Sequence, residues 1–149
     1  MLIVKIIQWD MGHRVVNHRS VCRGLHGHRY RAEICVKGDI VDEQGVSEEG
    51  MVVDFSDIKN IAITEIQDKF DHGFMVWEKD NELLDFFSSN DGHKPVVVPF
   101  TPTAENVAKY IYKILEDKFQ DKYDTGLKLH SVKLWETPSS YALFTEDDM

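Results

Sequence analysis

The segment from His28 to Lys37 alternates between apolar and polar side chains. The apolar positions are Tyr30, Ala32, Ile34 and Val36, and the positions on the other face are Arg29, Arg31, Glu33, Cys35 and Lys37. A period of two residues is typical of a strand with one buried and one exposed face, as in antiparallel sheets that are covered on one side. The chain must therefore build a sheet and supply a cover for one of its faces.

Two segments with helical periodicity can supply that cover. In the first, Ser56 is the expected cap, apolar residues recur at steps of three and four, and the helix should end near Asp71. In the second, Thr103 is the expected cap and Glu105 lies in the positively polarised first turn. The apolar stripes are Ile58, Ile61, Ala62, Ile66 and Phe70 in the first helix, and Val107, Ala108, Ile111, Leu115 and Phe119 in the second.

Three further segments are expected to be strands because they are short and apolar, with a turn between the last two. They are residues 2–9, 129–136 and 141–144. Residues 38–50 are acidic and contain three glycines, which predicts a loop. Residues 73–100 have no clear pattern beyond a short helix at 82–87 and an apolar segment at 96–98. The order ββααββ predicts a single α+β domain over residues 1–149, with two helices on one face of a four-stranded antiparallel sheet.

Composition excludes several classes of function. The chain has 17 basic and 26 acidic residues, and its net charge of -9 repels nucleic-acid backbones and anionic membranes. No apolar run approaches the ~18 residues that span a bilayer, and residues 1–10 contain neither a basic leader nor a cleavage site. The two cysteines form no Cys-x-x-Cys pair. We therefore expect a cytoplasmic protein with a small ligand and without a nucleic-acid or membrane partner.

Three of the seven histidines, His13, His26 and His28, fall within sixteen residues. In an extended chain His26 and His28 point to the same side, and a first strand paired in a hairpin can deliver His13 to the same place. Three neutral imidazoles leave one tetrahedral position of zinc open, as in catalytic zinc sites. The alternative is an accidental His-Gly-His pair beside a structural histidine. No role is assigned to the ungrouped His18, His93 and His130.

Other reactive side chains accompany these histidines. Cys22 lies four residues before His26, where a neighbouring cation would favour its thiolate and make it a general base; the alternative is an inert, half-buried thiol. Asp71 can fix the tautomer of the neighbouring His72 and tune its imidazole as a proton carrier near neutral pH. The alternative is that the two residues form a solvated helix end. Glu136 shares its strand face with apolar residues, where it can bind the N–H edge of a pterin or guanine, or an arginine.

Residues 11–32 carry five arginines and no acidic residue, whereas the remainder of the chain carries a net charge of -14. A cationic segment beside a metal suits a small polyanion such as a phosphorylated substrate. Arg29 and Arg31 belong to the exposed face of the predicted strand. The better candidates for binding phosphate are Arg14, Arg19 and Arg23.

These motifs together resemble the 6-pyruvoyl-tetrahydropterin synthase / 6-carboxytetrahydropterin synthase family from about Trp9 to Phe144. The matching pieces are Gly12-His13-Arg14, Cys22-Arg23-Gly24-Leu25-His26-Gly27-His28-Arg29-Tyr30, Gly50-Met51-Val52-Val53-Asp54-Phe55, Asp71-His72, Pro102-Thr103-Ala104-Glu105-Asn106 and Glu136-Thr137. The resemblance implies the tunnelling fold (T-fold) and a zinc enzyme that acts on 7,8-dihydroneopterin triphosphate. It assigns the metal to His13, His26 and His28, proton transfer to Cys22, Asp71 and His72, and the pterin ring to Glu136, with Thr103 and Glu105 nearby.

The resemblance also implies a homo-oligomer, expected to be a hexamer, with active sites near subunit boundaries. The three-residue gap between Cys22 and His26 resembles the branch that forms 6-carboxy-5,6,7,8-tetrahydropterin, acetaldehyde and triphosphate on the route to queuosine. The alternatives are the pyruvoyl branch, which does not cleave the side chain, and a non-catalytic pterin-binding homologue. A zinc hydrolase is disfavoured because no His-Glu-x-x-His segment is present. Trp9–His13 and Gly73–Trp77 depart from the family pattern, which affects the expected pocket shape.

Overall fold

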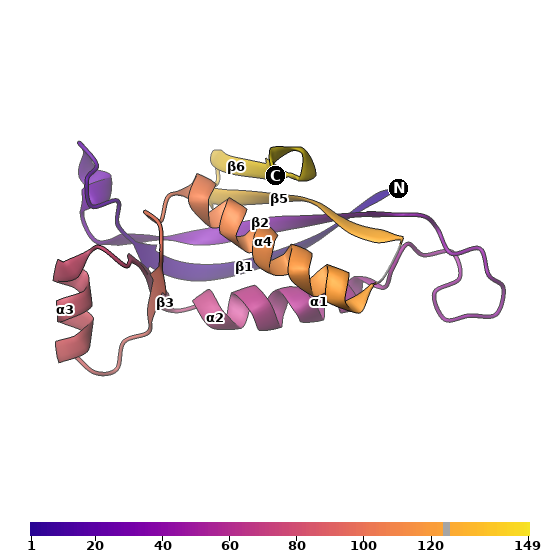
Figure 1. Cartoon of the computed structure of the whole chain (residues 1–149), viewed down its shortest axis with the longest axis horizontal. Coiled ribbons are helices and arrows are strands. Elements are labelled where there is room, and N and C mark those ends of the chain that lie inside the picture. Colours follow the sequence, from indigo (N-terminus) through magenta and orange to yellow (C-terminus); the bar gives the residue numbers. More distant parts are fainter. Residues whose placement is uncertain (124–125) are drawn as a thin grey trace.

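The chain forms a mixed six-stranded sheet, which the computed structural model describes over residues 1–123 and 126–149 (Figure 1). The strands are β1 (Leu2–His13), β2 (His26–Gly38), β3 (Gly73–Trp77), β4 (Pro95–Val98), β5 (Leu127–Thr137) and β6 (Ser140–Thr145). Their order across the sheet is β4-β3-β1-β2-β5-β6. The pairs β1–β2, β2–β5 and β5–β6 are antiparallel. In contrast, β3 runs parallel to β1, and β4 runs parallel to β3.

The helical elements lie between these strands. They are η1 (Val21–Arg23), α1 (Phe55–Ala62), the π-helical η2 (Ile63–Gln67), α2 (Asp68–Phe70), α3 (Asn81–Ser89), α4 (Ala104–Lys122) and η3 (Glu146–Asp148). Figure 1 shows α1, α2 and α4 lying along the sheet, while α3 stands apart at one end near β3. In the described parts of the chain, no helix combines the length and apolar character needed to cross a membrane.

The prediction of a four-stranded antiparallel sheet with two helices was wrong in two respects. The sheet has two more strands, β3 and β4, and both are parallel to their neighbours. A third helix, α3, lies between them; it confirms the short helix expected at residues 82–87 but was not among the two helices of the predicted architecture. All three elements come from residues 73–100, where β3 and β4 have only five and four residues and β3 pairs with just three residues of β1. Such short strands depend on their neighbours in the sheet and leave little periodicity to detect.

The predicted apolar faces are buried, and they form the core between sheet and helices. Tyr30, Ala32 and Ile34 of β2 are fully buried, and the predicted stripes of α1, η2, α2 and α4 are buried too, except for Ile61, which is partly buried. Cys35 differs from the prediction because it is buried instead of exposed. Cys35 pairs with Ser131, which is also buried, directly before the register of the β2–β5 ladder shifts, and its side chain is not among those of the core cluster.

Side-chain caps set where the two long helical segments begin. Thr103 caps α4, as predicted, by accepting a hydrogen bond from the Asn106 N–H at 3.4 Å. The cap of α1 is Asp54 instead of the predicted Ser56, because the Asp54 carboxylate accepts the Ser56 N–H at 2.6 Å. Asp54 is the better acceptor at the positive end of a helix, since it carries a full negative charge.

The first helical segment contains a π turn at η2, between α1 and α2. Ile58, Ala62, Ile66 and Phe70 are buried and spaced four residues apart. In a regular α-helix with 3.6 residues per turn, steps of four drift steadily around the axis. The wider π turn holds more residues and reverses part of this drift. It therefore returns Phe70 to the core and brings the following Asp71 next to β1, where it accepts a hydrogen bond from the Asp10 N–H.

Arg14, one of the candidate phosphate ligands, links the end of β1 to α3 through two carboxylates. Its Nε donates to Asp80 Oδ2 at 2.7 Å, and its Nη2 contacts both Asp80 and the exposed Glu82. Asp80 is buried and also caps α3 by accepting the Leu83 N–H. These hydrogen bonds from Arg14 lower the pKa of Asp80 from its ordinary value of 3.8. The ion pair therefore fixes the chain directly after His13.

Asp80→Asn is expected to lower the free energy of unfolding by about 2 kcal/mol near pH 7, because Arg14 loses its charged partner while the cap is kept. The Asp80 pKa is lower in the folded chain, so the contribution is complete above the unfolded value of about 3.9 and disappears as pH falls through the folded value. Urea unfolding near pH 7 and pH 3 should show the gap between wild type and variant closing at low pH. Glu82→Gln, which removes the exposed partner, is the control and should change little. An equal gap at both pH values would contradict the prediction.

Candidate active site

The three histidines predicted to bind a metal meet where β1 ends and β2 begins. His13 pairs with His26 across the ladder, and Met11 pairs with His28, so all three imidazoles leave the sheet on the face that carries the core. One potential ligand atom from each ring lies within 4.8 Å of the other two. The ring centroids are 4.5 to 5.1 Å apart.

Hydrogen bonds to backbone carbonyls orient two of these rings. His13 Nδ1 donates to the Pro102 carbonyl at 2.7 Å, and His26 Nδ1 donates to the Gly24 carbonyl at 2.8 Å. This arrangement leaves Nε2 of each ring as the acceptor, and it is the usual environment of a metal-binding histidine. His13 Nε2 is buried and has no hydrogen-bond partner among the described residues. An otherwise unpaired imidazole nitrogen of this kind fits a metal ligand.

The electrostatics of the cluster favour neutral imidazoles, which is the form that binds metals. Burial lowers the pKa of His13 and of His28 from the ordinary value of 6.5, and the positive charge of a neighbouring imidazolium would act in the same direction. Glu136 opposes this effect, since its Oε1 lies 3.5 Å from His13 Nε2 and 3.8 Å from His28 Nε2. The site therefore combines three nitrogen donors with one adjacent carboxylate.

Gly27, between His26 and His28, is required by the close approach of β1. A Cβ at this position would lie 2.9 Å from the Met11 carbonyl oxygen and 3.3 Å from the Gly12 Cα. Any side chain here would push β1 and β2 apart and separate His13 from the other two histidines. Glycine therefore permits the tight rung of the ladder on which the cluster depends.

A cavity of about 290 Å³ next to the cluster brings five of the ten predicted site residues together. It is lined by His13, Cys22, Thr103, Glu105 and Glu136. Cys22 is half-buried and lies on η1, Thr103 and Glu105 lie at the start of α4, and Glu136 lies near the end of β5. Four segments distant in the sequence thus contribute to one pocket.

The same cavity includes residues to which sequence reasoning assigned no role, namely His18, Ser140 and Tyr141. His18 accepts the Ser20 N–H through Nδ1 at 3.0 Å. Its position four residues before Cys22 was the one available signal. Ser140 and Tyr141 join the cavity because β6 folds back beside the end of β5.

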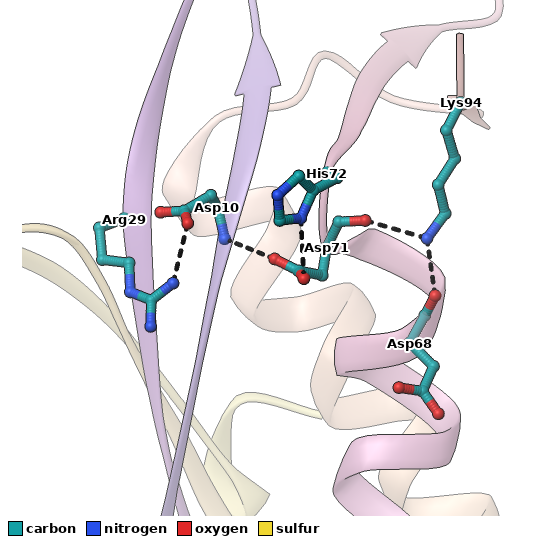
Figure 2. A network of polar contacts seen from close by, with 6 residues as sticks. All are labelled: Asp10, Arg29, Asp68, Asp71, His72 and Lys94. Carbon is teal, nitrogen blue, oxygen red and sulfur yellow. Dashed lines mark hydrogen bonds and ion pairs between the residues drawn. The ribbon is translucent and has the colours of Figure 1, made fainter. Parts of the chain in front are cut away.

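Asp71 and His72 do not line this cavity. They follow α2 on the other side of β1, where the backbone N–H of Asp10 donates to Asp71 Oδ1 at 3.0 Å (Figure 2). This hydrogen bond is the main reason that the pKa of Asp71 is below its ordinary value of 3.8. His72 Nδ1 lies 2.9 Å from Asp71 Oδ2, and the His72 side chain is 82% exposed. The two residues form a pair, but within one chain this pair is separate from Cys22.

Three of the arginines from the cationic segment lie away from the cavity. Arg23 is exposed on η1 and does not line the cavity among the described residues. Arg29 pairs with Asp10 and Arg31 pairs with Glu33 on the opposite face of the sheet, as expected for an exposed strand face.

Comparisons with known proteins show the family of this chain. A model of the family described as 6-pyruvoyl tetrahydropterin synthase matches residues 2–147. The chain belongs to this family. A relative from Haemophilus influenzae named 6-carboxy-5,6,7,8-tetrahydropterin synthase is 35% identical, and the match covers 97% of this chain and 98% of that protein. A relative of the same name from Aquifex aeolicus is 32% identical over the same shares of the two chains.

Solved structures support the 6-pyruvoyl tetrahydropterin synthase fold. An uncharacterized protein from Wolinella succinogenes superposes with a TM-score of 0.78 at 25% identity, covering 98% of each chain. The 6-pyruvoyl tetrahydropterin synthase of Caenorhabditis elegans has a TM-score of 0.69 at 20% identity, covering 97% of this chain and 94% of the other. The family resemblance inferred from the motifs is therefore confirmed.

Proposed function

We propose that the protein is a zinc-dependent 6-carboxy-5,6,7,8-tetrahydropterin synthase, converting 7,8-dihydroneopterin triphosphate to the carboxypterin, acetaldehyde and triphosphate. The observation that carries this proposal is the single cavity lined by His13, Cys22 and Glu136. The names of the relatives and the short gap between Cys22 and His26 favour the carboxy-forming branch.

In this proposal His13, His26 and His28 would hold the zinc, since three neutral imidazoles leave one tetrahedral position open. Bound zinc would polarise a substrate oxygen and stabilise negative charge while protons leave carbon. Cys22 acts as the base that removes a proton from the substrate side chain. The Glu136 carboxylate accepts the 2-amino and N3 hydrogens of the pterin ring and so fixes the side chain over Cys22. Thr103 and Glu105 border the same cavity and contact the ring.

Product analysis tests the reaction directly. Purified protein loaded with zinc is incubated with 7,8-dihydroneopterin triphosphate, and the products are separated and identified by mass spectrometry. We expect 6-carboxytetrahydropterin and one equivalent of acetaldehyde. Accumulation of 6-pyruvoyl-tetrahydropterin without acetaldehyde would replace the proposal with the pyruvoyl branch. Tight pterin binding without any product would indicate a non-catalytic homologue.

Glu136→Gln is expected to weaken binding of neopterin about 10- to 100-fold. The amide group presents a donor where the ring also presents a donor, and the charge-assisted hydrogen bonds are lost. Fluorescence titration measures the dissociation constant without turnover. Glu82→Gln is the control, because Glu82 is an exposed carboxylate that is not among the residues that line the cavity, and its replacement should leave binding unchanged. Equal binding by wild type and Glu136→Gln would exclude the proposed anchor.

The position of Asp71 and His72 supports an oligomer in which sites are shared, expected to be a hexamer. This carboxylate and imidazole face solvent, away from Cys22 of the same chain. A second copy of the chain that presents its Asp71 and His72 to the cavity would complete the proton-transfer set.

Mixing two inactive variants tests this sharing of sites. Cys22→Ala and His72→Ala are each expected to have little activity, and an unfolded and refolded mixture should regain about a quarter of the wild-type rate. Random assembly gives that fraction because each site needs an intact Cys22 from one chain and an intact His72 from its neighbour. A mixture that is no more active than its components would show that both residues act within one chain.

A further inference from the structure

His72 has a backbone conformation that requires support. Among the described residues it is the one non-glycine residue with a positive φ, at 58°. The left-handed region brings Cβ close to the backbone, so residues other than glycine seldom adopt it, although histidine does so more often than most. A conformation of this kind persists only where neighbouring groups hold it.

The peptide group between Asp71 and His72 is held at both ends. Its N–H, from His72, donates to the Asp10 carbonyl at 2.8 Å. Its carbonyl, from Asp71, accepts a hydrogen bond from Lys94 Nζ at 3.0 Å (Figure 2). The same Nζ donates to the Asp68 carbonyl at 2.7 Å. Lys94 thus binds carbonyls at the C-terminal end of α2, where a helix leaves acceptors unpaired and favours positive charge.

The backbone of Lys94 is itself fixed to the sheet. Its carbonyl accepts the Phe74 N–H at 2.9 Å, directly before β4 pairs with β3. The side chain therefore reaches back from an anchored position to the turn between α2 and β3. Because Lys94 is exposed, replacing its ammonium group removes these hydrogen bonds without opening the core.

The orientation of this peptide group determines where the His72 ring lies. Asp71 Oδ1 is fixed by the Asp10 N–H, and Asp71 Oδ2 is 2.9 Å from His72 Nδ1. If the peptide group rotates, His72 can return to a negative φ and its ring leaves the carboxylate. We propose that Lys94 is a positioning residue that holds the Asp71–His72 pair in its working geometry. This inference rests on the proposed function, in which that pair transfers protons.

The test compares Lys94→Met, Lys94→Arg and a control, Lys69→Met, in the zinc-loaded full-length protein. Lys69 is also exposed and lies in α2, but it pairs with the Glu65 side chain. Hydrogen exchange followed by mass spectrometry reports on the His72 amide, and steady-state kinetics with 7,8-dihydroneopterin triphosphate gives kcat and KM. For Lys94→Met we expect about tenfold faster exchange at His72 and about tenfold lower kcat with KM unchanged, because hydrogen bonds from a charged donor are lost. Lys94→Arg should restore both values, and Lys69→Met should change neither.

Three results would overturn the proposal. Unchanged exchange in Lys94→Met would show that Lys94 does not hold the peptide group. Faster exchange with unchanged kcat would show that the reaction does not need this restraint. An equal loss of kcat in Lys69→Met would indicate a general effect of surface charge. His72→Ala distinguishes the role of Lys94 from the proposed function of the pair. If His72→Ala is fully active, the proposed proton transfer by Asp71 and His72 fails as well. If His72→Ala is slow and Lys94→Met has a normal kcat, only the role of Lys94 is refuted.

Discussion

Replacing Cys22 with alanine is expected to lower kcat by about 10²- to 10⁴-fold while zinc content and pterin binding remain. This range is what a positioned proton-transfer group contributes. The thiol lines the cavity with His13 and Glu136 but belongs to neither the histidine cluster nor the proposed ring anchor. Its loss should therefore remove chemistry and preserve binding. Rates with 7,8-dihydroneopterin triphosphate, zinc analysis and neopterin titration measure the three quantities separately.

The other cysteine provides the matched control. Cys35 is buried at the bulge between β2 and β5 and does not line the cavity. Cys35→Ala should keep the wild-type rate, although it can lower stability by removing a buried sulfur atom. If Cys22→Ala also turned over substrate within about threefold of wild type, the base would have to be another group, and His18 in the same cavity would be the next residue to replace.

Removing one ligand of the histidine cluster is expected to lower the rate about as much as Cys22→Ala does. Unlike Cys22→Ala, it should also greatly lower the zinc content. His28→Ala should leave purified protein with little zinc, because two imidazoles provide too few ligands for a tight site. Turnover should fall to the background rate and should not return at zinc concentrations that saturate wild type. His28 is preferable to His13 for this test because His13 is fully buried and holds the Pro102 carbonyl.

His130→Ala controls for general effects of losing a histidine. His130 pairs with Glu146 at 2.9 Å and lies outside both the cluster and the cavity. It should bind one zinc per chain and retain full activity. Full zinc occupancy in His28→Ala, with unchanged thermal unfolding, would show that the metal is bound elsewhere or that two histidines suffice.

Much of the site could be predicted from the sequence because its chemistry is concentrated in short motifs on regular elements. The alternation of β2 places His26 and His28 on one face, and pairing with β1 adds His13. The parity of β5 likewise places Glu136 on the covered face, and its carboxylate lies near two of the imidazoles. The face on which each of these side chains lies follows from strand geometry, and the alternation of apolar and polar residues in the sequence predicts it.

The partners of charged groups could not be predicted in the same way. Arg14 looked like a phosphate ligand, yet Asp80, which lies sixty-six residues away in the sequence, binds it. Lys94 lies in the poorly patterned segment between the helices, and its Nζ donates to the carbonyls of Asp68 and Asp71, which no sequence pattern marks as its partners. Such contacts are decided by tertiary packing, as are the short parallel strands β3 and β4.

The π turn at η2 gives this protein an unequal tolerance of changes in chain length. Deleting a single residue from Ile63–Gln67 would let the turn close into a regular α-helix, and the residues after it would keep nearly the same direction, because a π turn holds about one residue more than an α turn. Deleting a single residue between Ile58 and Ala62, in the regular helix α1, would instead rotate the segments on either side of the deletion by about 100° relative to each other. Ile58 and Phe70 could then no longer both point into the hydrophobic core. The π turn is thus the place in this helical segment where the chain can lose a residue.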